Sequence, residues 1–151
     1  MPMHRIYTTP GLYLPKEKQE LAKAITKIYT SNGLPAFYVL VLFIDLPTDS
    51  FYVGGEQTSA RGVARFNVQH LARQFPDKKT KLGFMKMYED ALKPFTVDKK
   101  LNWEINLDEA DPLVWHINGV SPPAPKSEGE KLWVRENKPT PFEGPSFSDI
   151  L

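Results

Sequence analysis

Apolar residues recur with two different periods along the first half of the chain. Residues 3–8 are typical of a short strand. Residues 37–45 are almost all apolar and rich in β-branched and aromatic side chains, which predicts a central strand covered on both faces. Residues 16–32 carry apolar side chains at helical spacing, after Pro15 and up to an Asn-Gly stop. The apolar positions of this helix are Leu21, Ala22, Ala24, Ile25, Ile28 and Tyr29.

The same order of elements returns in the second half. Residues 62–71 are typical of a strand, and residues 101–107 predict another. Between them, Pro76-Asp77 opens a helix and Pro94 ends it. The apolar positions of this helix are Leu82, Met85, Tyr88, Ala91 and Leu92. The pattern therefore predicts an α+β fold, in which two consecutive β-α-β units form a four-stranded sheet with two helices on one face.

Residues 121–151 differ in composition from the rest of the chain. They hold six of the 14 prolines and few apolar residues, so they cannot form a core of their own. We expect one domain over residues 1–120, with units at about 2–60 and 61–120, followed by a Pro-rich C-terminal arm. The arm is either a disordered tail or a segment that docks Trp133 and Phe142 on the body or on a neighbouring subunit, and the tryptophan favours docking.

Composition narrows the classes of function. A net charge of +1 gives no field that would attract nucleic acid or an acidic membrane. The absence of cysteine excludes disulfides and thiol catalysis, and the three histidines show no ligand spacing, so neither a metal nor a cofactor is expected. The longest apolar run is too short to span a bilayer and no signal-peptide pattern is present, so we expect a cytoplasmic protein.

Pro2 is the first candidate for chemistry. A proline next to the initiator methionine allows Met1 to be removed, and the product ends in a secondary amine. An α-amino group titrates at roughly 7.7–8.0, and an apolar pocket or nearby cations would lower that value. Such an amine can act as a general base at neutral pH or as a nucleophile towards a carbonyl. The alternative is that Pro2 follows the start codon and has no role.

Arginines form the second candidate group. Arg61, Arg65 and Arg73 lie in or beside the strand predicted over residues 62–71. Arginine is suited to holding a substrate carboxylate through two parallel hydrogen bonds. For Arg61 an ordinary solvated charge is the favoured role. For Arg73, at a strand-to-helix junction, the two roles are equally favoured.

The other polar features favour structural roles. Gly54-Gly55 lacks the lysine and serine of a phosphate loop, so a turn or bulge with positive φ is expected there. His70 and His116 are expected to be structural rather than catalytic. Asp108, Glu109 and Asp111 are expected to form a solvated turn, and no nucleophilic triad or pair of carboxylates stands out.

Several motifs, taken in order, are similar to those of one known family. They are the Met-Pro start, Ala22-Lys23-Ala24-Ile25-Thr26, Phe51-Tyr52-Val53-Gly54-Gly55, His70-Leu71-Ala72-Arg73, and a closing stretch from Trp115-His116-Ile117-Asn118-Gly119 through Pro122-Pro123 to Glu130-Lys131-Leu132-Trp133. Over nearly the whole chain they resemble the cis-3-chloroacrylic acid dehalogenase group of the tautomerase superfamily, including its uncharacterised fungal members. The resemblance implies a homotrimer whose N-terminal proline is the catalytic base and whose arginine holds a carboxylate, roles that match Pro2 and Arg73.

The chain also departs from the family's pattern. The family's helical histidine falls at Tyr29, and its second arginine falls at Pro76. The tyrosine and glutamate that position and activate water fall near Ile105 and Ile117, which can do neither. These losses argue against hydrolytic dehalogenation, whereas proton transfer needs only a base and an anchor.

We therefore expect keto–enol tautomerisation of a small 2-oxo or 2-hydroxy-enoic acid, with weak or absent cis-3-chloroacrylate dehalogenation. Pro2 would be the base, Arg73 would hold the carboxylate, and Tyr29 would donate a hydrogen bond. One rival is a ferredoxin-like dimer in which Pro2 is inert and a pocket between sheet and helices binds a small molecule. Another is a tautomerase fold that has lost catalysis and binds protein.

Overall fold

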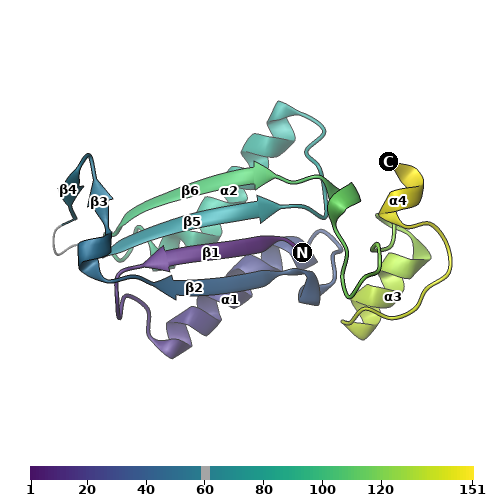
Figure 1. Cartoon of the computed structure of the whole chain (residues 1–151), viewed down its shortest axis with the longest axis horizontal. Helices are drawn as coiled ribbons and strands as arrows, with labels where there is room; N and C mark the ends of the chain where they lie inside the picture. The colour runs from purple at the N-terminus through teal and green to yellow at the C-terminus, as the bar shows by residue number, and fades with distance from the viewer. Residues whose placement is uncertain (59–61) are drawn as a thin grey trace.

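A four-stranded sheet forms the centre of the protein. The computed structural model describes residues 1–58 and 62–151. The strands are β1 (Met3–Thr8), β2 (Leu40–Asp45), β5 (Val63–His70) and β6 (Asn102–Glu109), in the order β2-β1-β5-β6. The pairs β1–β2 and β5–β6 are parallel, and β1 and β5 meet antiparallel at the centre (Figure 1). The predicted sheet of two β-α-β units is confirmed.

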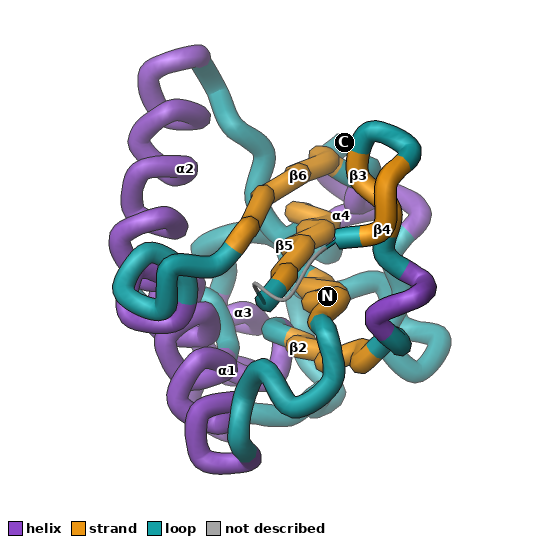
Figure 2. The backbone as a smooth tube through the Cα atoms, turned by 90° about the vertical axis from the view of Figure 1, so that its left-hand side faces the viewer, coloured by secondary structure: helices purple, strands orange, loops and turns teal. Residues whose placement is uncertain are grey.

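Helices α1 (Pro15–Thr30) and α2 (Lys78–Leu92) cover one face of this sheet (Figure 2). Pro15 stands at the start of α1, where its missing N–H costs nothing, and the Asp77 side chain caps α2 by accepting the Thr80 N–H at 2.7 Å. The buried face of α2 is Phe84, Tyr88 and Leu92. The expected place of Leu82 on that face is wrong, since this side chain is 58% exposed.

Strand parity divides the side chains of the sheet between its two faces. On β1, His4, Ile6 and Thr8 are fully buried beneath the helices. The alternate positions point to the face that α1 and α2 leave uncovered (Figure 1). By register, the uncovered face is apolar along β2, mixed along β1, where Arg5 lies between Met3 and Tyr7, and polar along β5 and β6. It carries Met3, Arg5, Tyr7, Leu40, Leu42, Ile44, Arg65, Asn67, Gln69, Glu104, Asn106 and Asp108.

The expectation of a central strand over residues 37–45 is wrong in two respects. The strand β2 begins only at Leu40, because Ala36–Tyr38 form the short 3₁₀ turn η1. In addition, β2 lies at the edge of the sheet. The apolar run has side chains on both faces of β2. Val41 and Phe43 pack on the core beneath the helices, whereas Leu42 on the uncovered face is 37% exposed in the single chain.

Short elements complete the chain. They are the 3₁₀ turns η2 (Thr48–Ser50), η3 (Lys93–Phe95) and η4 (Pro112–Val114), and a hairpin of β3 (Tyr52–Val53) and β4 (Glu56–Gln57). Gly54 and Gly55 turn this hairpin with φ of +63° and +86°, as expected of that dipeptide. Arg61 and the expected junction of the two units near residue 60 lie outside the described residues.

Beyond residue 120 the chain forms helices α3 (Glu128–Glu136) and α4 (Phe147–Ile150) at the end of the sheet where β1 begins (Figure 1). Trp133 of α3 is 1% exposed, and its ring centroid lies 5.6 Å from that of Phe37 and 6.0 Å from that of Tyr38. Its Nε1 donates to the Thr140 carbonyl at 2.6 Å, so its one polar atom is satisfied. In residues 1–58 and 62–151, no helix has the length and apolar character needed to cross a bilayer.

Trp133 is predicted to hold the C-terminal segment on the body. Trp133→Ala should lower stability by about 3–5 kcal/mol, or roughly 6–20 °C in Tm, because a buried indole leaves a large cavity. The neighbouring Val134 is 42% exposed, so Val134→Ala should change stability by less than about 0.5 kcal/mol. Differential scanning calorimetry measures both, and equal Tm values for the two variants would show that the segment does not dock through this side chain.

Candidate functional site

Pro2, Tyr29, His70 and Arg73 gather at one end of the sheet. Pro2 is buried, and its carbonyl accepts the Leu40 N–H at 3.0 Å. The antiparallel register ends at Met3 opposite Gln69, and one further residue on each strand places Pro2 beside His70. Tyr29 ends α1 on the same side, where its hydroxyl lies 3.4 Å from His70 Nδ1. The fold thus brings together three residues that the sequence proposed and one that it did not.

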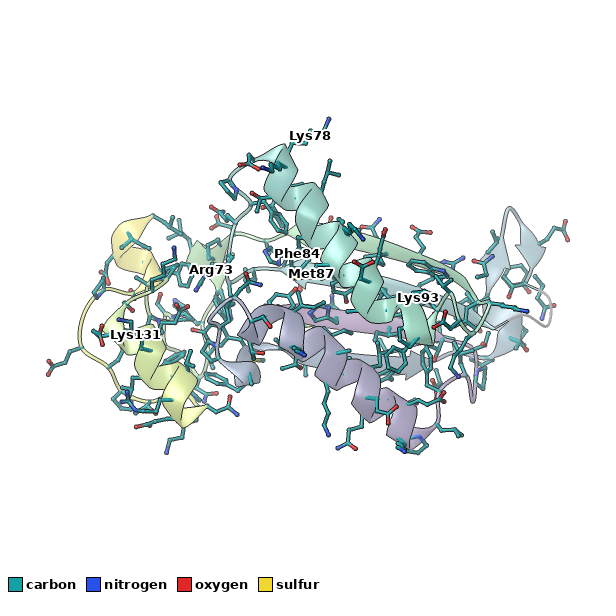
Figure 3. The ribbon with its side chains drawn as sticks, turned by 180° about the vertical axis from the view of Figure 1, so that it is seen from behind. Arg73, Lys78, Phe84, Met87, Lys93 and Lys131 are labelled. Carbon is teal, nitrogen blue, oxygen red and sulfur yellow. The ribbon has the colours of Figure 1, made fainter. Side chains whose placement is uncertain are left out.

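A cavity of about 350 Å³ opens between α1 and α2 beside these residues. Its walls include side chains from both helices, and Figure 3 shows Phe84 and Met87 on α2 with Arg73 nearby. The apolar lining is Ile28, Leu34, Phe75, Phe84 and Met87, and the polar lining is Tyr29, Asn32, His70, Arg73, Gln74 and Thr80. Pro2 is not one of the described lining residues, but the register places it beside His70, which is one.

Two histidines that are far apart in the sequence meet under the helices. His4 Nδ1 lies 2.7 Å from the Tyr88 hydroxyl, and the His4 ring lies edge-on to Tyr29 at 5.4 Å. Burial lowers the pKa of His4 to about 3, with a smaller contribution from the charge of His70. Burial likewise lowers the pKa of His70 to about 4. Both imidazoles are therefore neutral at pH 7.

His70 is the member of this pair that faces the cavity. It is 4% exposed, and its ring stacks on Phe75 with centroids 4.4 Å apart and an interplanar angle of 4°. Its Nε2 finds no hydrogen-bond partner among the described residues. The sequence assigned His70 a structural role, and strand parity was the signal that could have placed it on the helix side with Val68.

Arg73 is held by a carboxylate from the C-terminal segment. Its Nη1 and Nη2 donate to Glu130 at 2.9 and 2.8 Å, and Nη1 also donates to the Ala72 carbonyl. Glu130 is 3% exposed, and it also accepts the Lys126 N–H at 2.7 Å. Both terminal nitrogens of Arg73 are thus engaged within the chain. Sequence analysis missed Glu130, although the Ser127-x-x-Glu130 spacing marks a helix start at that point.

Two of the three acidic residues at and after the end of β6, Glu109 and Asp111, have defined partners. Asp108 and Glu109 belong to β6, and Glu109 accepts the Phe75 N–H at 2.9 Å and pairs with Lys81 at 2.6 Å. Asp111 caps η4 by accepting the Leu113 N–H. All three residues are exposed, as expected, but the expected turn is wrong for Asp108 and Glu109, which lie in a strand.

Ile105 and Ile117, which stand where the family has its water-activating residues, lie in different parts of the fold. Ile105 packs under the helices on β6, and Ile117 forms a small bridge with Val120. Arg65 lies on the uncovered face, where it donates to Asn102 and pairs with Glu104. In the part of the chain that the structure describes, no group of three or more histidine, aspartate or glutamate side chains could hold a metal ion.

The start of the chain lies in apolar surroundings. Met1 packs against the hydrophobic core, and burial lowers the pKa of its α-amino group to about 5. An amine in this environment is neutral at pH 7, because the charged form loses its hydration.

Comparison with known proteins places the chain in a family. Residues 1–138 match the family described as "Putative oxalocrotonate tautomerase enzyme". A probable enzyme from the thermophilic fungus Aspergillus fumigatus is 42% identical over 94% of this chain and 98% of that chain, with a TM-score of 0.87. Native RhCC from Rhodococcus jostii RHA1 is 38% identical over 93% of this chain and 100% of that chain, also with a TM-score of 0.87. The curated proteins gave no match.

More distant structures share the fold. N1, a member of the cis-3-chloroacrylic acid dehalogenase family, is 15% identical over 90% of this chain and 98% of that chain, with a TM-score of 0.69. A fused 4-OT protein described as a symmetric trimer is 19% identical over 83% of this chain and 100% of that chain, with a TM-score of 0.61. The resemblance drawn from the sequence is confirmed, and the chain belongs to the tautomerase superfamily, in the oxalocrotonate tautomerase-like family that its first 138 residues match.

Proposed function

We propose that the protein is a keto–enol tautomerase whose general base is Pro2, exposed as a secondary amine once Met1 is removed. The observation that carries this proposal is the apolar setting of the chain start, where burial lowers the pKa of the α-amino group of Met1 to about 5. The Pro2 amine, one residue further into the buried strand end, is subject to the same desolvation. It would be neutral at pH 7 and able to accept a proton.

The proposed reaction moves one proton between two atoms of the substrate. Neutral Pro2 removes the proton from the enol oxygen or from the carbon α to the carbonyl, and the resulting ammonium returns it to the other atom. Burial raises the pKa of Tyr29, so its hydroxyl remains protonated and can donate a hydrogen bond. Arg73 would hold the carboxylate of a 2-oxo acid, although its positive charge is already paired with Glu130 through Nη1 and Nη2.

Assembly as a homotrimer is part of the proposal. The fused 4-OT relatives are described as trimers, and this chain has an uncovered sheet face that is apolar along the edge strand β2. An apolar surface of this kind is suited to burial between subunits. A location in the cytoplasm remains a prediction from the sequence.

The first prediction concerns Pro2 itself. Pro2→Ala should lower the rate of enol-to-keto conversion at least tenfold, about 1.4 kcal/mol of barrier. The reason is that alanine replaces a secondary amine, held in place by the proline ring, with a primary amine that is free to rotate. Turnover of phenylpyruvate enol is followed by absorbance, and intact mass establishes that Met1 is absent from both proteins. Equal rates for the two proteins, with Met1 removed, would rule out Pro2 as the base.

The pH dependence gives a second prediction. A base with a lowered pKa is active in its neutral form, so kcat/KM should be constant near pH 7 and fall as the pH drops through that pKa. The apparent pKa of this acidic limb should lie below the roughly 7.7–8.0 of an exposed α-amine. A profile that still rises above pH 8 would contradict a buried amine as the base.

The choice of reaction gives a third prediction. Adding water to a haloacrylate needs a group that orients and deprotonates the water, and Ile105 and Ile117 can do neither. Glu109 is already bound to Lys81 and to the Phe75 N–H. We expect measurable tautomerisation and little or no chloride release from cis-3-chloroacrylate in parallel assays on one preparation. Chloride release at a comparable rate would reveal another water-activating residue, and Glu109→Gln would be the first variant to make.

A further inference from the structure

We infer that the cavity between α1 and α2 is the substrate pocket and that it takes an uncharged, mainly apolar carbonyl compound in preference to an acid, with His70 bonding the substrate oxygen. The inference rests on the proposed tautomerase function, because it names the substrate class of that site. It differs from the 2-oxo acid expected from the sequence.

The first argument is the charge of the cavity. Of its described lining residues, Arg73 alone carries a charge, and both of its terminal nitrogens donate to Glu130. A substrate carboxylate would have to displace Glu130 or lie beside it. Displacement would take from a buried carboxylate its only side-chain partner among the described contacts and leave it the Lys126 N–H at 2.7 Å. If Glu130 stays in place, the substrate carboxylate and the Glu130 carboxylate lie close together and repel each other.

Nearby cations do not replace Arg73. Lys81 is bound to Glu109 at 2.6 Å and is not a lining residue. His70 is neutral at pH 7, because burial lowers its pKa to about 4. An ionised substrate would therefore lose its hydration among apolar side chains without gaining a counter-charge.

The second argument is the unused polar atom of His70. Its Nδ1 faces the Tyr29 hydroxyl at 3.4 Å, and Nε2 has no partner in residues 1–58 and 62–151. A buried polar atom without a partner costs free energy that a ligand oxygen could recover. When Tyr29 donates to Nδ1, Nε2–H can donate to a keto oxygen. In the other tautomer, Nε2 accepts the hydroxyl of an enol. One residue can thus bind both forms of the substrate.

The third argument is size and position. A volume of about 350 Å³ suits a small molecule. The stacked rings of His70 and Phe75, with Phe84 beside them, favour an aromatic or branched apolar group. Since Pro2 lies next to His70 on the adjoining strand, an oxygen bound at His70 is close to the proposed base.

The test compares two ligands that differ in charge and by one methyl group. Phenylpyruvate and methyl phenylpyruvate are titrated into the protein by isothermal calorimetry at pH 7.5, where the acid is ionised. We expect the ester to bind at least tenfold more tightly than the acid. His70→Phe, which keeps an aromatic ring and removes Nε2, should weaken ester binding at least fivefold. Tighter binding of the acid would overturn the inference and restore Arg73 as the anchor.

Gly83 allows the cavity to be filled without disturbing the fold. It lines the cavity from α2, and a Cβ added there meets no atom within 4 Å. Gly83→Leu should abolish ester binding while the matched Gly83→Ala retains it, and neither should lower Tm, because both residues favour a helix more than glycine does. Equal ester affinity of Gly83→Leu and Gly83→Ala would place the ligand elsewhere.

Binding and turnover separate this inference from the proposed function. Ester binding does not need the base, so Pro2→Ala should bind methyl phenylpyruvate with unchanged affinity while losing turnover. If Pro2→Ala keeps full turnover, the proposed base is wrong even where ester binding in the cavity stands. If the ester does not bind but phenylpyruvate enol is still converted through Pro2, the inference fails and the tautomerase function stands.

Discussion

The ion pair between Arg73 and Glu130 joins the two parts of the structure. Arg73 follows strand β5, and Glu130 lies in the first turn of α3, 57 residues later in the sequence. Glu130 is 3% exposed, so removing the Arg73 side chain would leave its carboxylate charge buried without its ionic partner. Loss of one partner from a buried ion pair typically lowers the free energy of unfolding by about 3–5 kcal/mol. The pair thus helps to fix where the C-terminal segment lies, together with the buried Trp133 side chain of the same helix.

The same pair sets the electrostatics of the site. It pairs Arg73, the one charged residue among the described lining residues of the cavity, while burial keeps His4 and His70 neutral. What remains between the helices is a set of neutral dipoles on an apolar background: two imidazoles and the hydroxyls of Tyr29 and Tyr88. Such groups can orient and polarise an oxygen without the desolvation cost that free charges would impose.

Periodicity predicted the fold because each half of the chain repeats one simple unit. The parity of β1 and the spacing of Leu21, Ile25 and Tyr29 follow directly from burial on one side. Strand order was harder, since an apolar run such as residues 37–45 looks the same at a sheet edge as at its centre. The Arg73–Glu130 contact could not be predicted, because a pair separated by 57 residues leaves no local pattern.

Two features of this chain bear on how a tautomerase would bind its substrate. The chain has a proline at the buried end of β1, and it has an arginine at the family's position whose fork is satisfied internally. In the proposed mechanism, proton transfer at Pro2 would depend on desolvation of the amine, which the apolar surroundings of the chain start would supply without an anchor. Carboxylate binding would depend on a free counter-charge, and Glu130 pairs with the charge of Arg73. These two requirements are physically independent, so the pair with Glu130 would affect the substrate class and not the proposed base.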